Sequence, residues 1–238
     1  MKPFEYSFVI KKDGGIVQVI PVEFVKSFSA KSIKITPNLA KQVVKVSYPF
    51  FVSRSKAVDF LEIKKDWVSK QLEKVPDKII ICDGTEISLL GKKYKISHIP
   101  NARRGVWIEG DYIFVSGDKA FLGRRVKDFA KAEIKKYFCK RVKYYASVLK
   151  VEFGKIAVKD TTSRWGSCAS NGNLSFSWRL AFAPLFVIDY IVAHEVSHLA
   201  ELNHSYRFWR VVKQIYDGDV EKAQKWLSRN GLSLYAIE

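Results

Sequence analysis

One short run, H-E-V-S-H at residues 194–198, limits most strongly what this chain can fold into. A third histidine, His204, follows six residues after His198. On a helix, residues four apart leave the same face one turn apart, so the imidazoles of His194 and His198 can share one tetrahedral zinc ion. Glu195 lies one residue off that face, where a carboxylate reaches a metal-bound water without being a ligand. The spacing predicts a metal site with Glu195 as the catalytic base.

His204 is the predicted third ligand, but a straight helix cannot bring it to the metal. Ten residues beyond His194, it would lie about 15 Å further along the helix axis. We therefore expect the chain to turn between Glu201 and His204, with Asn203 as the helix C-cap, because Asn tolerates the left-handed conformation that ends helices.

The alternative to a metal site is chance, because H-E-x-x-H also occurs in proteins in which the two histidines are simply packed or solvated. Two observations favour the metal. The chain has four histidines, and three of them fall within eleven residues. The preceding residues 186–193 are mostly apolar, which predicts a buried helix. The longest apolar stretch, residues 180–192, is interrupted by Pro184 and Asp189 and is too short to span a bilayer, so we expect no membrane span.

The composition indicates a globular, strongly basic protein. With 238 residues, 47% of them hydrophobic, the chain can bury a sizeable core in one large or two small domains. Cys82, Cys139 and Cys168 are odd in number and widely spaced, which argues against a disulfide framework and suits the reducing cytoplasm. The net charge of +17 favours acidic partners such as nucleic acid, nucleotides or an anionic membrane surface; the alternative is a merely basic composition.

Residues 1–116 have mainly the patterns of short strands. Asp13-Gly14-Gly15 predicts the turn of a hairpin, and polar and apolar residues alternate at 32–36 and 44–47, which together indicate a small antiparallel sheet. A helix is expected from Ser53 to about Leu72, followed by further strands between residues 79 and 116.

A long amphipathic helix is expected over residues 119–150. One face is apolar, and the segment carries eleven Lys and Arg residues against Asp128 and Glu133, a net charge of +9. Such a face is usually just solvated; the alternative is a surface that meets the phosphates of nucleic acid.

A β-hairpin is predicted next, because Asn171-Gly172 is a strong turn signal and residues 174–178 alternate strictly. An exposed strand edge here, just before the metal helix, could accept an extended peptide by strand addition, or the strand could be paired in the ordinary way. Helices are expected at 206–216 and 220–229.

A denser pattern surrounds the histidines. It consists of Arg164-Trp165-Gly166-Ser167-Cys168, Gly172-Asn173-Leu174-Ser175-Phe176, Asp189-Tyr190, H-E-x-x-H-L at 194–199 and Asn203-His204-Ser205-x-x-Phe208-Trp209. In these residues the chain resembles the YgjP-like family of zinc-dependent metallopeptidase domains, which is related to SprT-like proteases. The resemblance is dense over about 155–212 and looser upstream.

The resemblance implies an α+β fold, with N-terminal antiparallel strands and a helix (1–116) followed by a zincin-like, or minigluzincin, helix-and-sheet core (117–238); one continuous domain is the alternative. His194, His198 and His204 match the family's metal ligands, and Glu195 matches its base. Tyr206 stands where family members often have proline, and the family's basic N-terminal run is largely absent around residues 27–31.

The expected chemistry is hydrolysis assisted by one Zn²⁺ per chain, with another divalent metal as the alternative. Arg164, Trp165 and Tyr190 are candidate substrate-binding residues, and for Arg164 and Tyr190 the alternative is a packing role. Three functions stay open: a zinc metallopeptidase, a metal-dependent nucleotide phosphohydrolase similar to nucleoside triphosphate pyrophosphatases, and a nucleic-acid-binding module with a structural metal. Glu195 argues against the third, because a closed structural site needs no base.

Overall fold

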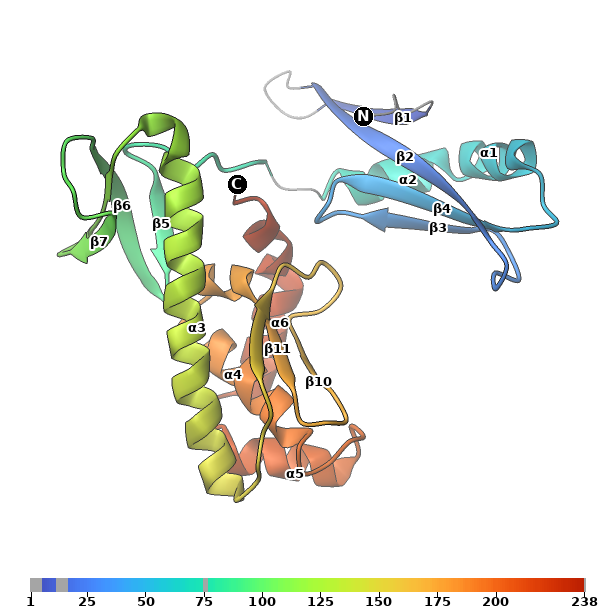
Figure 1. Ribbon diagram of the computed structural model, residues 1–238. Coiled ribbons are helices and arrows are strands. Elements are labelled where there is room, and N and C mark those ends of the chain that lie inside the picture. The colour runs from blue at the N-terminus through green and yellow to red at the C-terminus, as the bar shows by residue number, and fades with distance from the viewer. Residues whose placement is uncertain (1–5, 12–16, 75–76, 238) are drawn as a thin grey trace. The chain divides into compact units, whose positions relative to one another are not determined.

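The computed structural model describes residues 6–11, 17–74 and 77–237. It divides into two compact units, Met1–Asp77 and Lys78–Glu238 (Figure 1). No helix of the described residues is both long enough and apolar enough to cross a membrane.

The first unit is a four-stranded sheet with two helices. The strands are β1 (Ser7–Lys11), β2 (Val17–Ser27), β3 (Lys34–Asn38) and β4 (Val43–Pro49), in the order β1-β2-β4-β3. The predicted pairing of β1 with β2 is confirmed, although the turn Asp13-Gly14-Gly15 lies outside the described residues. The sheet is mixed and not purely antiparallel, because β3 takes the outer edge and leaves β4 to run parallel to β2.

The helical segment of the first unit is divided into α1 (Arg54–Ile63) and α2 (Lys65–Leu72). Ser53 caps α1, since its side chain accepts the backbone N–H of Lys56. Leu61 and Val68 of these helices are fully buried with Val44 and Val46 of β4 in the core of the unit.

The second unit begins with the strands β5 (Glu86–Leu89), β6 (Lys92–Ile99), β7 (Val106–Glu109) and β8 (Tyr112–Ser116), in the order β5-β6-β8-β7. The long amphipathic helix is confirmed as α3 (Leu122–Leu149), and its apolar face is buried in the same core as Ile96 and Ile113 of the sheet. This shared core joins the sheet to α3, so the units divide after Asp77 and not at the predicted boundary after residue 116.

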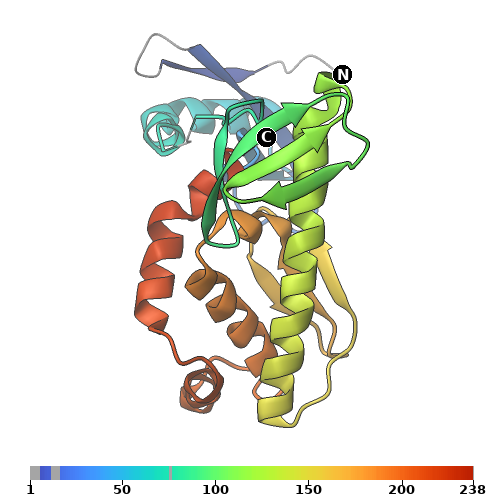
Figure 2. The same cartoon turned by 90° about the vertical axis from the view of Figure 1, so that its left-hand side faces the viewer.

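The rest of the second unit surrounds one buried helix. The strands β9 (Ile156–Lys159), β10 (Gly166–Cys168) and β11 (Leu174–Ser177) form a sheet in the order β10-β11-β9, and the helices are α4 (Leu185–Ser197), α5 (Tyr206–Ile215) and α6 (Val220–Asn230). The predicted hairpin is β10–β11, with Gly172 at φ 75° in its loop. α4 lies between α3 and α6 (Figure 2) and contacts β10, so the second unit has the α+β helix-and-sheet core that was expected.

A polar contact fixes α4 on α3. Asp189 in the first half of α4 accepts a hydrogen bond from Arg141 Nε at 2.8 Å and another from the Tyr137 hydroxyl at 2.9 Å. Both partners belong to α3, so the rotation of α4 about its own axis is set five residues before His194.

Candidate metal centre

The structure brings the three predicted histidine ligands together. His194 lies in the last turn of α4, His198 is the C-cap of that helix, and His204 precedes α5. One ring nitrogen from each lies within 4.8 Å of the other two, and Nε2 of His194 is 3.0 Å from Nε2 of His204. Two nitrogens bound to the same tetrahedral zinc ion lie roughly 3.3 Å apart, so the spacing suits a single metal.

The chain turns toward the site earlier than predicted. α4 ends at Ser197, so the turn begins at His198 and not between Glu201 and His204, and Asn203 is not the C-cap. The backbone N–H of Leu199 bonds to the carbonyl of Val196, a tight i→i−3 contact that ends the helix. His198 still has a helical conformation (φ −67°), so its imidazole keeps the one-turn spacing from His194.

The hydrogen bonds and burial of the histidines favour metal binding. His198 Nδ1 is 3.1 Å from the carbonyl oxygen of Glu201; since a carbonyl only accepts, Nδ1 carries the proton and Nε2 keeps its lone pair. Burial, with smaller effects from His198 and His204, lowers the pKa of His194 to about 4. Neutral imidazoles are the form that binds zinc.

Glu195 is held between α4 and the strand β10. Its side chain is buried, and its carboxylate accepts the backbone N–H of Cys168. Burial raises the pKa of Glu195 to about 7, against the opposing effects of Arg164 and the Cys168 N–H. A Cβ on Gly166 would lie 2.5 Å from Glu195 Cγ, so any larger residue there would displace the Glu195 side chain. A carboxyl group with a pKa near 7 can both accept and return a proton at neutral pH.

A cleft of about 660 Å³ contains these groups and all three predicted substrate residues. Trp165 packs against Tyr235 with ring centroids 5.2 Å apart. Tyr190 is buried and its hydroxyl accepts a hydrogen bond from Gln224 Nε2 at 2.9 Å, which leaves the hydroxyl proton available to a group in the cleft. Arg164 is exposed at the rim.

The sequence interpretation missed the α6 side of this cleft. Gln224 and Leu227 of α6 line it beside α4, and neither is marked by a motif or by local spacing. Gly166 was noticed only as part of the family pattern, since no local signal connects it with a residue twenty-nine positions later.

The strand β10 has a free edge at the cleft. Ser177 N–H bonds to the carbonyl of Trp165 at 2.8 Å, and Ala169 N–H bonds to the carbonyl of Asn173 at 2.9 Å, so these residues direct their backbone groups toward β11. Along an antiparallel strand these directions alternate from one residue to the next, so the immediate neighbours of Trp165 and Ala169 point the other way. Gly166 and Cys168 therefore direct their backbone groups away from β11, and one of them, the Cys168 N–H, reaches Glu195.

A family model described as YgjP-like, metallopeptidase domain matches residues 31–230. The chain belongs to this YgjP-like family. It is therefore a metallopeptidase domain, as the resemblance implied, and the matched residues of the YgjP-like chain include parts of both compact units. The family description names neither nucleotides nor nucleic acid.

Among solved structures, the YgjP-like chain is similar to the crystal structure of the metallopeptidase zymogen of Pyrococcus abyssi abylysin. The identity is 20%, the match covers 41% of this chain and 94% of that chain, and the TM-score is 0.35. The YgjP-like chain has no significant match among curated protein sequences.

Proposed function

We propose that this chain is a zinc-dependent metallopeptidase in which His194, His198 and His204 hold one zinc ion and Glu195 is the catalytic base. The observation that carries the proposal is the convergence of three imidazoles and a buried carboxyl group in one cleft beside a free strand edge. When bound, zinc activates a water molecule and polarises the carbonyl group that is attacked. Three protein ligands leave a position for that chemistry, whereas a structural site has four.

Glu195 moves the proton in this proposal. Its carboxylate takes a proton from the attacking water and passes it to the leaving amine of the cut peptide. The absence of a side chain at Gly166 leaves room for the carboxylate against β10, and the Cys168 N–H holds it there. The base is therefore positioned before substrate binds.

An extended peptide would add to the free edge of β10 as a further strand. The backbone N–H and carbonyl of Gly166 and the carbonyl of Cys168, which point away from β11, supply its hydrogen bonds, while the Cys168 N–H stays on Glu195. Tyr190 would donate its hydroxyl proton to the oxygen that gains negative charge during the attack. Arg164 and Trp165, at the same end of the cleft, would contact residues of the substrate that flank the cut bond.

The same cleft is poorly suited to a nucleoside triphosphate. Arg164 is the only Lys or Arg among the described residues that line it, so little positive charge is available for three phosphates. A peptide backbone needs no such charge. We therefore favour the peptidase over the phosphohydrolase and over a structural metal in a binding module. The absence of disulfides among the described cysteines fits the cytoplasmic location that we also propose.

The test combines metal content with a hydrolysis screen that covers an unfolded protein, a peptide library and nucleoside triphosphates. We expect about one zinc per chain in the wild type and in Glu195→Gln, and none in His198→Ala. Peptide cleavage should be lost in both variants. His98→Ala, which removes the fourth histidine, and Glu221→Gln, on the exposed face of α6, should behave as wild type. A wild type that takes up no metal, or that cleaves only nucleotides, refutes the proposal.

A further inference from the structure

Three phenylalanine side chains cluster at one end of the first unit. Phe28 follows β2, while Phe50 and Phe51 follow β4. The two strands are parallel neighbours that end side by side, with Ser27 opposite Pro49. The ring of Phe28 stacks on that of Phe50 with centroids 5.6 Å apart, and Phe50 meets Phe51 edge to face at 5.4 Å.

These rings contribute nothing to the core of their own unit. Phe28 is 87% exposed, Phe51 68% and Phe50 51%. The core lies behind them, around Ile20, Val44 and Leu61, and none of the three phenylalanines packs against it. An exposed apolar cluster of this kind usually marks a binding surface, because leaving large aromatic rings in water is unfavourable.

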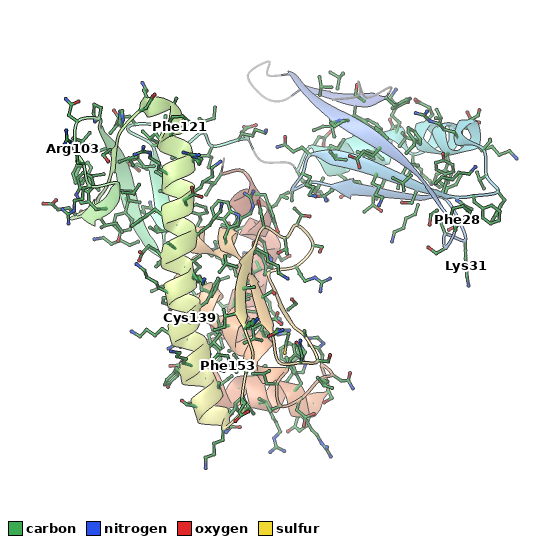
Figure 3. All side chains as sticks on the ribbon, viewed as in Figure 1. Phe28, Lys31, Arg103, Phe121, Cys139 and Phe153 are labelled. Atoms are coloured by element: carbon green, nitrogen blue, oxygen red, sulfur yellow. The ribbon has the colours of Figure 1, made fainter. Side chains whose placement is uncertain are left out.

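The segments around the rings, from the end of β2 onward and from the end of β4 into α1, carry basic and no acidic residues. Residues 26–32 and 49–56 contain Lys26, Lys31, Arg54 and Lys56, and no Asp or Glu. All four side chains are exposed, and no ion pair of the described residues engages any of the three lysines. Figure 3 shows Phe28 and Lys31 at the same end of the unit. The partner of this surface should therefore carry negative charge beside flat apolar groups.

We propose that this aromatic–basic patch (Phe28, Phe50, Phe51, Lys26, Lys31 and Lys56) binds single-stranded nucleic acid. Unpaired bases stack on exposed aromatic rings, and lysines on either side contact the phosphates that follow the bases along the strand. In a duplex the base faces are already stacked on one another and cannot reach the phenylalanines. The net charge of +17 adds a long-range attraction for the same partner.

The patch is distinct from the metal centre and shares no residue with it. Nucleic-acid binding and peptide hydrolysis can therefore fail independently. Variants of the patch should keep full zinc content and full activity on a short peptide, whereas Glu195→Gln should keep full nucleic-acid binding.

Fluorescence anisotropy with the full chain and a labelled oligothymidine of about 15 nucleotides tests the proposal. Phe50→Ala should weaken binding roughly five- to hundredfold, the range expected for one lost base–aromatic stack. Phe28→Ala, at the most exposed of the three positions, should act in the same direction without affecting folding. Lys31→Ala should reduce the slope of log affinity against log salt by about 0.7.

The controls are an apolar and a basic residue of the same unit outside the patch. Ile63 is 76% exposed at the end of α1, and Lys70 is exposed on α2. Ile63→Ala and Lys70→Ala should bind as the wild type does. Equal affinity for a duplex of the same length, or unchanged binding by both phenylalanine variants, overturns the proposal. It is equally overturned if anionic vesicles or an acidic peptide bind at the patch and the oligonucleotide does not.

Discussion

Replacing Gly166 by alanine should disable the enzyme without removing its metal. The added Cβ would lie 2.5 Å from Cγ, 2.6 Å from Oε1 and 2.8 Å from Cδ of Glu195. Carbon atoms in contact prefer a separation of about 3.5–4.0 Å, so the Glu195 side chain must move by about 1 Å. That movement also lengthens or breaks the hydrogen bond from the Cys168 N–H.

A displacement of about 1 Å in a catalytic group costs on the order of a hundredfold in rate, or about 2.7 kcal/mol in activation free energy. We therefore expect kcat of Gly166→Ala on a fluorogenic peptide to fall about a hundredfold. Zinc content should be unchanged, because the atoms nearest to the added Cβ all belong to Glu195 and none belongs to the three histidines.

The matched control is Gly123→Ala in α3, where an added Cβ approaches no atom closer than 3.2 Å. It should keep wild-type kcat and wild-type zinc content. The reasoning is refuted if Gly166→Ala is folded, binds zinc and keeps wild-type kcat. A parallel loss of zinc and activity would also refute it, since that outcome means that the methyl group disturbs the histidines and not the base.

Three further predictions concern residues of α4. Asp189→Asn leaves Arg141 without its ion pair on α3, and we expect urea unfolding to show a loss of about 1–3 kcal/mol. Because the pKa of His194 is lowered to about 4 in the folded protein, the metal-free wild type should lose up to about 3 kcal/mol of stability relative to metal-free His194→Gln as pH falls from about 6.5 to about 4 in thermal melts; the raised pKa of Glu195 acts in the opposite direction in both proteins and cancels in this difference. Tyr190→Phe removes the proposed donor to the developing oxyanion, so kcat should drop roughly ten- to hundredfold with zinc content unchanged, and an unaltered kcat would exclude that role.

Much of the local structure follows from the sequence. The apolar stripe of residues 119–150 predicts α3, and Asn171-Gly172 predicts the β10–β11 hairpin, because both depend on periodicities and turn preferences within a few residues. The parallel pairing of β2 with β4 was not predictable in this way. Alternation within a strand determines which face is buried and carries no information on the direction of its neighbour.

In the candidate site, too, some features follow from local spacing and others do not. The spacing of His194, Glu195 and His198 by itself sets the relation of these side chains, because one helical turn separates positions i and i+4. The position of His204 depends on where α4 ends, and backbone hydrogen bonds around His198 decide that.

Only the tertiary structure places Gly166 against Glu195 and Gln224 against Tyr190. These pairs are about thirty residues apart in the chain, and packing between separate elements brings them together. The sequence alone therefore determined which groups we propose for the chemistry, since their spacing is local. The packing of β10 and α6 around α4 decided how those groups are held, since contacts between distant segments leave no local pattern.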